Sequence, residues 1–212
     1  MVTTVLKKPQ RSARKPKGDG HLRRGEILEA AQRIFLAEGY HGATIRKIAD
    51  EVGVSSTALY MHFKDKDEIL LEISEGVVGT LLAINSEISA RPISAAERVR
   101  LMLDAYMQFA LDNPNTYQLV FCGSGGMISA DKEAQAQALG EACFQKFVSV
   151  VEEIAAAGQL RVGSVDSAAQ SLWVACHGLV ALLITKPNFH WSQADELRSV
   201  LLDSMLNGLL TD

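Results

Sequence analysis

The chain has 212 residues, of which 48% are hydrophobic, five are proline and three are cysteine. This length suits one large domain or a small module followed by a larger one, and the apolar content is sufficient for a core without disulfides or metals. Cys122, Cys143 and Cys176 lack paired spacing and are odd in number, so we expect reduced thiols in a cytoplasmic protein.

Charge is distributed unevenly along the chain. Residues 1–24 contain eight Lys or Arg and one acid, whereas the rest contain 13 basic and 24 acidic side chains. A basic arm on an acidic body indicates that a polyanion binds at one end, although a disordered solubilising tail has the same composition. No apolar stretch follows Lys7 and Lys8, and the longest apolar run is too short to cross a bilayer. We therefore expect neither a secretory signal nor a membrane segment.

The first predicted elements are a basic arm and a helix. Residues 1–21 are rich in Lys, Arg, Pro and Gly, and we expect them to be disordered. Leu28, Ala31 and Phe35 then recur with helical spacing before Gly39, which can end that helix.

Two short helices are predicted next. Thr44 is a good N-cap for a helix to Val52, which Gly53 would close, and Ser55 caps a second helix to about Met61. Two short helices that meet at a glycine predict a helix-turn-helix, whose second helix enters the major groove of DNA.

Longer helices fill the rest of the chain. Asp65 with Glu68, and Ser94 with Glu97, have the capping-box spacing that opens a helix. The predicted helices run over about 65–90, 94–113, a short stretch after Pro114, 131–157, 165–186 and 193–210. Because no alternating strand pattern occurs, the expected fold class is all-α. We expect a three-helix helix-turn-helix domain at 22–72 and a helical bundle at 73–212 for ligand binding and dimerisation.

The second short helix begins with small side chains. Ser56, Thr57 and Ala58 would let its backbone approach base edges, where the hydroxyls can form hydrogen bonds and the Thr methyl can touch a thymine methyl. The donors that follow directly, where they would meet phosphates, are Tyr60, His62, Lys64 and Lys66.

The run from Gly39 to Leu70 resembles the N-terminal signature of the tetracycline-repressor (TetR) family. The positions that follow the family pattern in order are Thr44, Ile48, Ala49, Gly53, Val54, Ser55, Leu59, Tyr60, His62, Phe63 and Lys66. The match covers about residues 24–72, and its many spaced positions make it highly specific. Ser56 stands where the family often has Lys, and Thr57 stands where it often has Gly, so the operator sequence does not follow from better-known members.

This resemblance implies a dimeric DNA-binding transcription regulator, namely a repressor that a small ligand releases from a pseudo-palindromic operator. The side chains that would contact phosphates are Thr44, Tyr60, His62 and Lys66. Those that would face the groove are Ser56, Thr57 and Met61. Arg46 and Ser55 complete the expected DNA-binding set, while Phe63 is expected in the core.

A second, shorter resemblance concerns the C-terminal half. Trp173, His177 and Gly178, together with Asn113–Pro114 and the run 117–121, resemble a TetR subgroup that has a Trp-His-Gly C-terminal domain. This pattern identifies no ligand.

The last two predicted helices have wider apolar stripes than one core face needs. The surplus indicates that both helices pack against a partner subunit as a four-helix interface, which also suits an operator with two half-sites. The expected interface residues are Leu172, Cys176, Leu179, Leu183, Leu197, Leu201, Leu206 and Leu209.

A ligand cavity is expected among large side chains that come from several helices and are mixed with few charges. This composition favours a hydrophobic or neutral small-molecule effector. The expected lining residues are Met102, Tyr106, Phe109, Tyr117, Phe121, Phe144, Phe147, Trp173 and His177. Each of them is also explained as core, and His177 as a hydrogen-bonded core or interface residue.

Catalysis finds little support in the sequence. Cys176 and His177 are adjacent on a helix and point about 100° apart. The stretch 123–126 lacks the Gly-Lys-Ser/Thr of a phosphate loop, and the five histidines have no metal-ligand spacing. We therefore expect no enzyme, cofactor, metal or membrane partner. Transcription activation and ligand storage without DNA regulation remain open alternatives.

Two further expectations concern the DNA complex. The basic arm would track the DNA backbone or enter the minor groove through Lys7, Lys8, Arg11, Arg14, Lys15 and Lys17. The helix at 65–90 would join the two functions, since a tilt of this helix caused by ligand would change the spacing between recognition helices.

Overall fold

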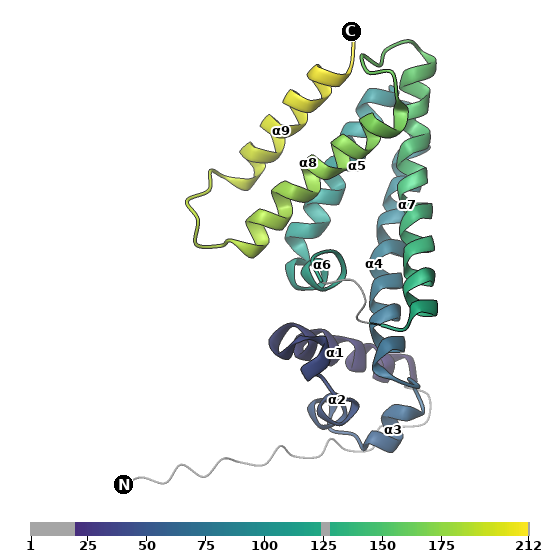
Figure 1. Cartoon of the computed structure of the whole chain (residues 1–212), viewed down its shortest axis with the longest axis vertical. Helices are drawn as coiled ribbons and strands as arrows, with labels where there is room; N and C mark the ends of the chain where they lie inside the picture. The colour runs from purple at the N-terminus through teal and green to yellow at the C-terminus, as the bar shows by residue number, and fades with distance from the viewer. Residues whose placement is uncertain (1–19, 124–127, 212) are drawn as a thin grey trace. The chain divides into compact units, whose positions relative to one another are not determined.

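The computed structural model describes residues 20–123 and 128–211, so the predicted basic arm lies outside the described residues except at its end. Within these ranges the chain forms α-helices and no strand, which confirms the all-α prediction (Figure 1). One isolated bridge pairs Leu160 with Leu210. The helices are α1 (Gly20–Gly42), α2 (Ile45–Val52), α3 (Ser56–Tyr60), α4 (Lys66–Ser89), α5 (Ala95–Asp112), α6 (Pro114–Phe121), α7 (Ala130–Ala156), α8 (Val165–Thr185) and α9 (Ala194–Leu209).

The described residues form two compact units. Unit 1 contains the residues up to 73 and those of 128–132, and unit 2 contains 74–123 and 133–211. Two helices, α4 and α7, have residues in both units. The first turn of α7 was not expected to belong with the N-terminal helices.

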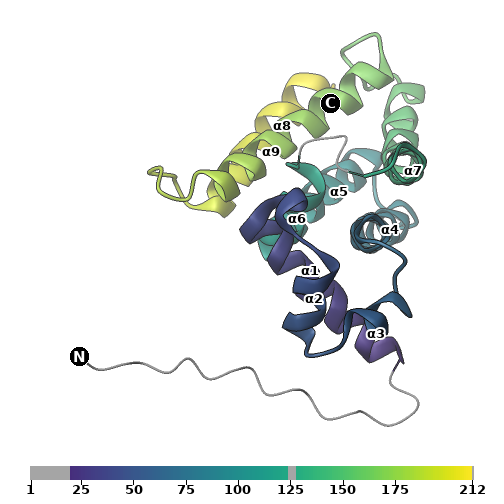
Figure 2. The ribbon, with the colours of Figure 1, turned by 60° about the horizontal axis from the view of Figure 1, so that its bottom comes forward.

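Unit 1 consists mainly of α1, α2, α3 and the first turns of α4 (Figure 2). Its core contains Ile27, Phe35, Ile48, Leu59 and Phe63, each at most 2% exposed. Phe63 therefore packs in the core, as the sequence predicts. The short helices contribute Ile48, Ala49 and Leu59 to this core, so α2 and α3 are held by packing and not by their own length.

Glycine and capping residues set the boundaries of these helices. Gly39 leaves helical geometry with φ 73° and ψ 164°, but the chain makes one more turn to Gly42, slightly later than the sequence predicts. Thr44 caps α2, Gly53 ends it in the left-handed region at φ 75°, and Ser55 caps α3, all as predicted.

The two predicted capping boxes differ. Ser94 and Glu97 form the full reciprocal pair that opens α5. At α4, Asp65 accepts a hydrogen bond from the Glu68 amide at 2.8 Å, but the Glu68 carboxylate accepts from the Lys64 amide at 2.7 Å instead of from that of Asp65. The predicted box at Asp65 is thus only half formed, because the Glu68 carboxylate reaches the amide one residue further back.

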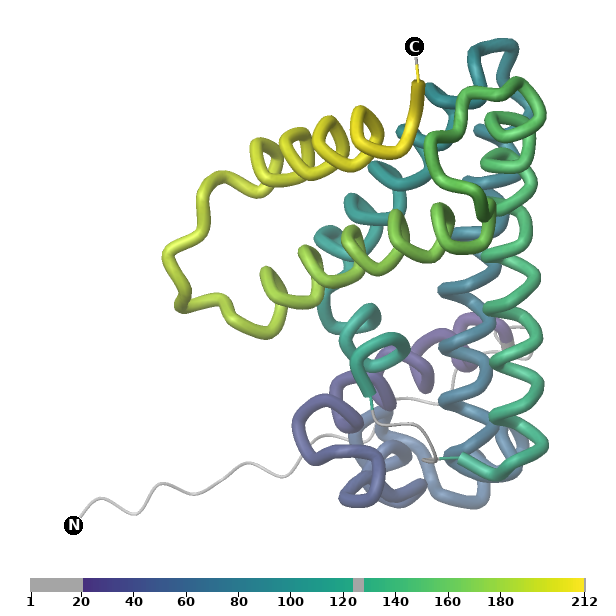
Figure 3. The backbone as a smooth tube through the Cα atoms, turned by 45° about the horizontal axis from the view of Figure 1, so that its top comes forward, coloured from purple at the N-terminus to yellow at the C-terminus, as the bar shows by residue number. Residues whose placement is uncertain are grey.

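Unit 2 is built around α5, which contacts α8 and α9, while α6 packs against α5 and α8. Its central side chains include Val99, Met107, Tyr117 and Val180, none of which is measurably exposed. The helices α4 and α7 lie side by side here (Figure 3), with Gln135 donating to Glu75 at 3.0 Å. The core thus draws on helices that are far apart in the sequence.

Two described helices, α4 and α8, are long and apolar enough to cross a membrane by length and composition alone. The core helices of water-soluble proteins pass the same test, and both helices contribute buried residues such as Ile73 and Leu172 to the core. Their apolar content is therefore weak evidence for a membrane segment.

Candidate nucleic-acid interface and ligand cavity

The turn between α2 and α3 is held by short backbone hydrogen bonds. The amide of Val54 donates to the carbonyl of Ala49 at 2.9 Å, and that of Gly53 donates to Asp50 at 3.2 Å. A left-handed residue is needed between these bonds, and glycine adopts that conformation without steric cost. Leu59, which is fully buried, then anchors the inner face of α3. The geometry is that of a helix-turn-helix.

The outer face of α3 presents side chains of different sizes to solvent. Thr57 is exposed, and Tyr60 and Met61 are 55% and 84% exposed, respectively. Ser56 is half-buried beside them. A monomeric protein gains nothing by exposing Tyr60 and Met61 next to each other, so this face has the character of a contact surface.

The predicted DNA-binding residues Thr44, Arg46 and Ser55, at α2 and at the start of α3, are also exposed. The Arg46 side chain is 86% exposed and lies 3.9 Å from the Asp50 carboxylate. The hydroxyl oxygens of Thr44 and Ser55 accept the capping amides of Lys47 and Ala58, which leaves each hydroxyl proton available to donate to an anion.

Lys66 has a different environment from the one its family position suggests. Its ammonium donates to the carbonyl of Tyr40 at 2.8 Å and lies 4.0 Å above the Tyr40 ring. The Ala43 carbonyl is a second, longer partner at 3.5 Å. Lys66 therefore holds the end of α1 against the start of α4, and this internal role was not predicted from sequence.

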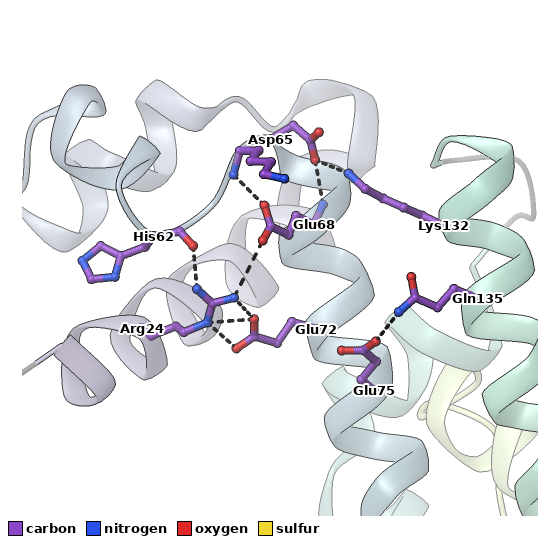
Figure 4. Close-up of polar contacts among 9 residues, drawn as sticks. Arg24, His62, Asp65, Glu68, Glu72, Glu75, Lys132 and Gln135 are labelled. Atoms are coloured by element: carbon purple, nitrogen blue, oxygen red, sulfur yellow. Dashed lines mark hydrogen bonds and ion pairs between the residues drawn. The ribbon is translucent and has the colours of Figure 1, made fainter.

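Arg24 fixes the segment that leaves α3. Its Nε donates to both carboxylate oxygens of Glu72 at 2.7 and 2.8 Å, and its Nη1 donates to the carbonyl of His62 at 2.5 Å (Figure 4). The guanidinium also lies 4.1 Å from the centre of the Phe63 ring. The hydrogen bond to Glu72 is the main cause of a raised Arg24 pKa.

These contacts of Arg24 with Glu72, His62 and Phe63, which we call the Arg24 clamp, correct the charge argument made from the sequence. Arg24 is one of the eight cations counted in the basic segment, yet its charge is used inside unit 1. The neighbouring Arg23 pairs with Glu26 at 2.8 Å. Only the backbone of His62 takes part in the clamp, while its half-buried side chain points away from Arg24 in Figure 4.

The start of α4 binds the start of α7 within unit 1. Lys132 donates to Asp65 at 2.6 Å, and the Ser129 amide donates to Asp67 at 3.0 Å. Burial acts to raise the pKa of Asp65, but the hydrogen bonds from Lys132 and the Glu68 backbone outweigh it, and the pKa is lowered. Two helices that continue into unit 2 are thus fastened together next to the helix-turn-helix.

Unit 2 contains a cavity of about 510 Å³ whose lining is mostly apolar. Six of the predicted residues line it: Met102, Tyr106, Phe121, Phe144, Phe147 and Trp173. The residues that sequence reasoning missed are Val78, Leu81, Asn85, Leu103, Gln137, Gly140, Glu141 and Cys143. Those on α4 and α7 face the cavity because these helices run side by side, and nothing in a single sequence gives that pairing.

Three of the predicted lining residues do not reach the cavity. Phe109 lies elsewhere, and Tyr117 is fully buried behind the lining. His177 instead joins a polar cluster with Tyr106 and Tyr117, which we call the Tyr-His cluster. The Tyr106 and Tyr117 hydroxyls lie 2.8 Å apart, and the Nδ1 of His177 lies 3.1 Å from the first and 2.6 Å from the second.

Burial sets the ionisation of the Tyr-His cluster. It raises the pKa of Tyr106 to about 12, raises that of Tyr117 further, and lowers that of His177. All three side chains are neutral near pH 7 as a result. The cluster can donate and accept hydrogen bonds but carries no net charge.

The predicted dimer interface needs a correction. Leu172, Cys176 and Leu206 are at most 8% exposed because they fill the core of unit 2, so no partner can reach them. The other five predicted residues are half-buried: Leu179, Leu183, Leu197, Leu201 and Leu209. The exposed apolar side chains on these helices are instead Trp173, Val174, Leu182 and Val200, at 40%, 62%, 48% and 57%.

Small, half-buried residues lie next to the exposed Val174 on α8. Val174, Gly178 and Ala181 follow one another at helical spacing, and no atom outside the helix lies within 4 Å of a side chain built at Gly178. Another helix can approach closely at such positions. We call the exposed apolar residues of α8 and α9 the α8–α9 face.

A helix-turn-helix unit joined to a helical bundle that contains an apolar cavity defines the class of this protein: it is an all-α helix-turn-helix protein. Residues 27–73 match the family described as "Bacterial regulatory proteins, tetR family", and residues 99–207 match "Tetracyclin repressor-like, C-terminal domain". The chain belongs to the TetR family, whose members are regulators and not enzymes.

Similar proteins include both a transcriptional activator and a transcriptional repressor. The chain is 31% identical over 121 residues to the transcriptional activator FasR of Mycolicibacterium smegmatis, covering 57% of this chain and 55% of FasR. It is 36% identical over 83 residues to the transcriptional repressor KstR2 of Mycobacterium tuberculosis, covering 39% of this chain and 42% of KstR2. These matches span about half the length of each relative. The same fold occurs in a TetR-family protein from Rhodococcus RHA1, with a TM-score of 0.78 at 22% identity over 90% of this chain and 98% of the other.

Proposed function

We propose that this protein is a dimeric transcription repressor that binds a pseudo-palindromic operator and is released by a small hydrophobic ligand. The observation that carries the proposal is the exposed face of α3, where Thr57, Tyr60 and Met61 extend from a rigid helix-turn-helix. Small and apolar side chains at this place suit contacts with base edges, and Arg46 and the hydroxyl of Thr44 suit phosphates. Such a regulator acts in the cytoplasm, on the nucleoid.

Dimerisation through the α8–α9 face supports this proposal. Two copies related by a two-fold axis would bury the exposed apolar residues of both helices, and four-helix interfaces are a common way to do so. The resulting dimer would hold two recognition helices about 34 Å apart, as two successive half-sites require.

The cavity supports the regulatory part of the proposal. Its volume of about 510 Å³ suits a small molecule. The helix α4 begins at Lys66 in unit 1 and contributes Val78, Leu81 and Asn85 to the cavity lining. A ligand that shifts α4 would therefore change the position of the recognition helices, and a coupling of about 1–3 kcal/mol suffices for a 5–150-fold change in DNA affinity. Trp173, His177 and Gly178 further suggest membership of the Trp-His-Gly subgroup.

Activation is the second candidate, and the similarity to the activator FasR favours it. The two candidates share one DNA-binding surface and differ only in where the operator lies relative to the promoter. Deletion of the gene should raise transcription of its target if the protein is a repressor and lower it if the protein is an activator. A ligand store that does not regulate DNA predicts no change.

The DNA-binding proposal is tested by fluorescence anisotropy with intergenic DNA from upstream of the gene. The full chain should prefer one such fragment over scrambled DNA of the same length by at least about 1000-fold. Thr57→Ala should weaken this preference about fivefold, because it removes one groove contact. The same change at the exposed Thr80 of α4 is the control and should have no effect. Equal affinity for both DNAs in the unmodified chain would contradict the proposal.

A further inference from the structure

The Tyr-His cluster lies beside the cavity and supplies one polar position in its mostly apolar lining. The other polar lining residues are Asn85, whose amide donates to Cys143, and Gln137 and Glu141, which are both exposed to solvent. Tyr106 lines the cavity, whereas Tyr117 and His177 lie behind it and do not contribute to the lining. Of these three hydrogen-bonded groups, the Tyr106 hydroxyl is the one whose residue borders the cavity. A ligand in the cavity would therefore contact Tyr106 and neither Tyr117 nor His177.

The chemistry of the cluster allows its outer member to donate. A neutral His has one ring proton, and each phenol has one. When that proton is on Nδ1, His177 can donate to Tyr117, and Tyr117 can donate to Tyr106. The Tyr106 proton is then free for a ligand acceptor, and each bond in the chain polarises the next. The separations of 2.6 and 2.8 Å suit both internal bonds.

The charges around the cavity exclude one class of ligand. None of the described lining residues is Lys or Arg, and the single charged side chain among them is the carboxylate of Glu141. A ligand anion would be desolvated without a counter-charge and repelled by Glu141. The neutral form of His177, whose pKa burial lowers, supplies no positive charge either.

We infer that the cavity selects an apolar molecule with a neutral hydrogen-bond acceptor, such as a ketone, and that Tyr106 donates to this acceptor. The inference rests on the proposed function, because it takes the cavity to be the ligand site. Beyond the proposed function, the inference specifies the polarity and charge of the ligand. Tyr106 recognises the ligand acceptor, and Tyr117 and His177 orient the Tyr106 side chain.

Three probes with one aromatic body separate the contributions: 2-acetylnaphthalene carries the ketone, 2-ethylnaphthalene is its hydrocarbon analogue, and 2-naphthoate is the anion. Equilibrium dialysis at pH 7.5 with detection by absorbance measures each affinity for the full-length protein. We expect the ketone to bind about tenfold more tightly than the hydrocarbon, as one neutral hydrogen bond allows. The anion should bind at least about tenfold more weakly than the ketone.

Tyr106→Phe removes the donor and keeps the ring. It should lower the affinity for 2-acetylnaphthalene about tenfold and leave that for 2-ethylnaphthalene within about twofold. Thr80→Val, which removes an exposed hydroxyl of α4 outside the cavity lining, is the control and should leave both affinities unchanged. Circular dichroism melting of each variant checks its fold, and the three-probe comparison on the unmodified chain stands without any variant.

Different results overturn different claims. If none of the probes binds, the cavity is not a ligand site, and the ligand part of the proposed function fails together with this inference. If the probes bind but the hydrocarbon or the anion equals the ketone, or if Tyr106→Phe affects all probes alike, this inference fails while the ligand site stands. If the ketone is selected through Tyr106 but operator affinity does not respond to it, the inference stands and ligand release by such molecules fails.

Discussion

Arg46 and Lys66 are both cations of the helix-turn-helix unit, but their surroundings differ. Arg46 is 86% exposed, whereas the Lys66 ammonium is bound to the Tyr40 carbonyl and ring. We predict that Arg46→Met weakens binding to specific and non-specific DNA alike and makes the salt dependence shallower by about one unit of log K per log salt. Lys66→Met should instead mainly lower the free energy of unfolding, by about 1 kcal/mol, because it leaves the Tyr40 carbonyl without its donor.

Salt titrations of DNA binding and urea unfolding of both variants distinguish these roles. The family resemblance implies that Lys66 contacts phosphate, and the structure adds an internal contact. If Lys66→Met changed the salt slope by one unit and left the unfolding free energy intact, the phosphate role would be the important one.

His177 predicts how stability responds to acid. Because burial lowers its pKa below the ordinary 6.5, the unfolded chain binds a proton here more readily than the folded chain does. This contribution to stability is fully present above about pH 6.5 and is lost as the pH falls from there through the folded pKa. Urea unfolding between pH 7.5 and 5 should therefore show a smaller decrease for His177→Gln than for the unmodified chain. His190→Gln, at an exposed position, should leave the decrease unchanged.

At the scale of elements, Gly140 gives direct access to the cavity from α7. It lines the cavity, and a side chain built there meets no atom within 4 Å outside its own helix. Gly140→Leu should fill part of the cavity and lower the affinity for 2-acetylnaphthalene at least about tenfold. DNA affinity without ligand should stay within about twofold, since unit 1 is untouched. Gly79→Leu, at an exposed and equally open helical position of α4, is the matched control. Equal loss of probe binding in both variants would show that the cavity is not where the probe binds.

The order and the ends of the helices could be read from the sequence because they depend on local signals. Thr44, Gly53, Ser55 and the Ser94–Glu97 pair act within a few residues of themselves, and each has the predicted role. The prediction that Glu68 accepts from the Asp65 amide was wrong. The Glu68 carboxylate accepts from the Lys64 amide instead, and residue spacing does not determine which of two neighbouring amides a Glu side chain reaches.

Contacts between distant segments could be predicted only in part. Five large aromatic side chains and Met102 were identified as lining residues of the cavity, because size and apolarity are visible in a sequence. The contributions of Asn85, Gln137 and Gly140 depend on the pairing of α4 with α7. The Arg24 clamp joins residues 48 positions apart, and in the sequence Arg24 looks like part of the basic arm.

At the scale of the whole molecule, the wide stripes of α8 and α9 correctly indicated more apolar surface than one chain buries, but not which residues stay exposed. Periodicity alone does not tell the core side of such a stripe from its outer side. Leu172 and Cys176 were assigned to the partner, yet they face the core, while Val174 and Leu182 remain exposed. The surface open to a partner therefore lies on the same two helices, but on a different side of each.

Val174→Asp therefore tests the dimer. Val174 is 62% exposed in the single chain, so the substitution should leave the unfolding of the monomer nearly unchanged. In a two-fold dimer the change would place a carboxylate from each subunit in the apolar interface, and an unpaired buried charge costs about 3 kcal/mol or more. Sedimentation equilibrium should show a dimer dissociation constant that is at least about 100-fold higher. Binding to a two-half-site operator should fall towards that of a single half-site, because each unit 1 then binds alone.

Ala134→Asp, an exposed position on α7, adds the same charge away from the α8–α9 face and should change neither measurement. A dimer that withstands Val174→Asp would have its interface elsewhere on the molecule.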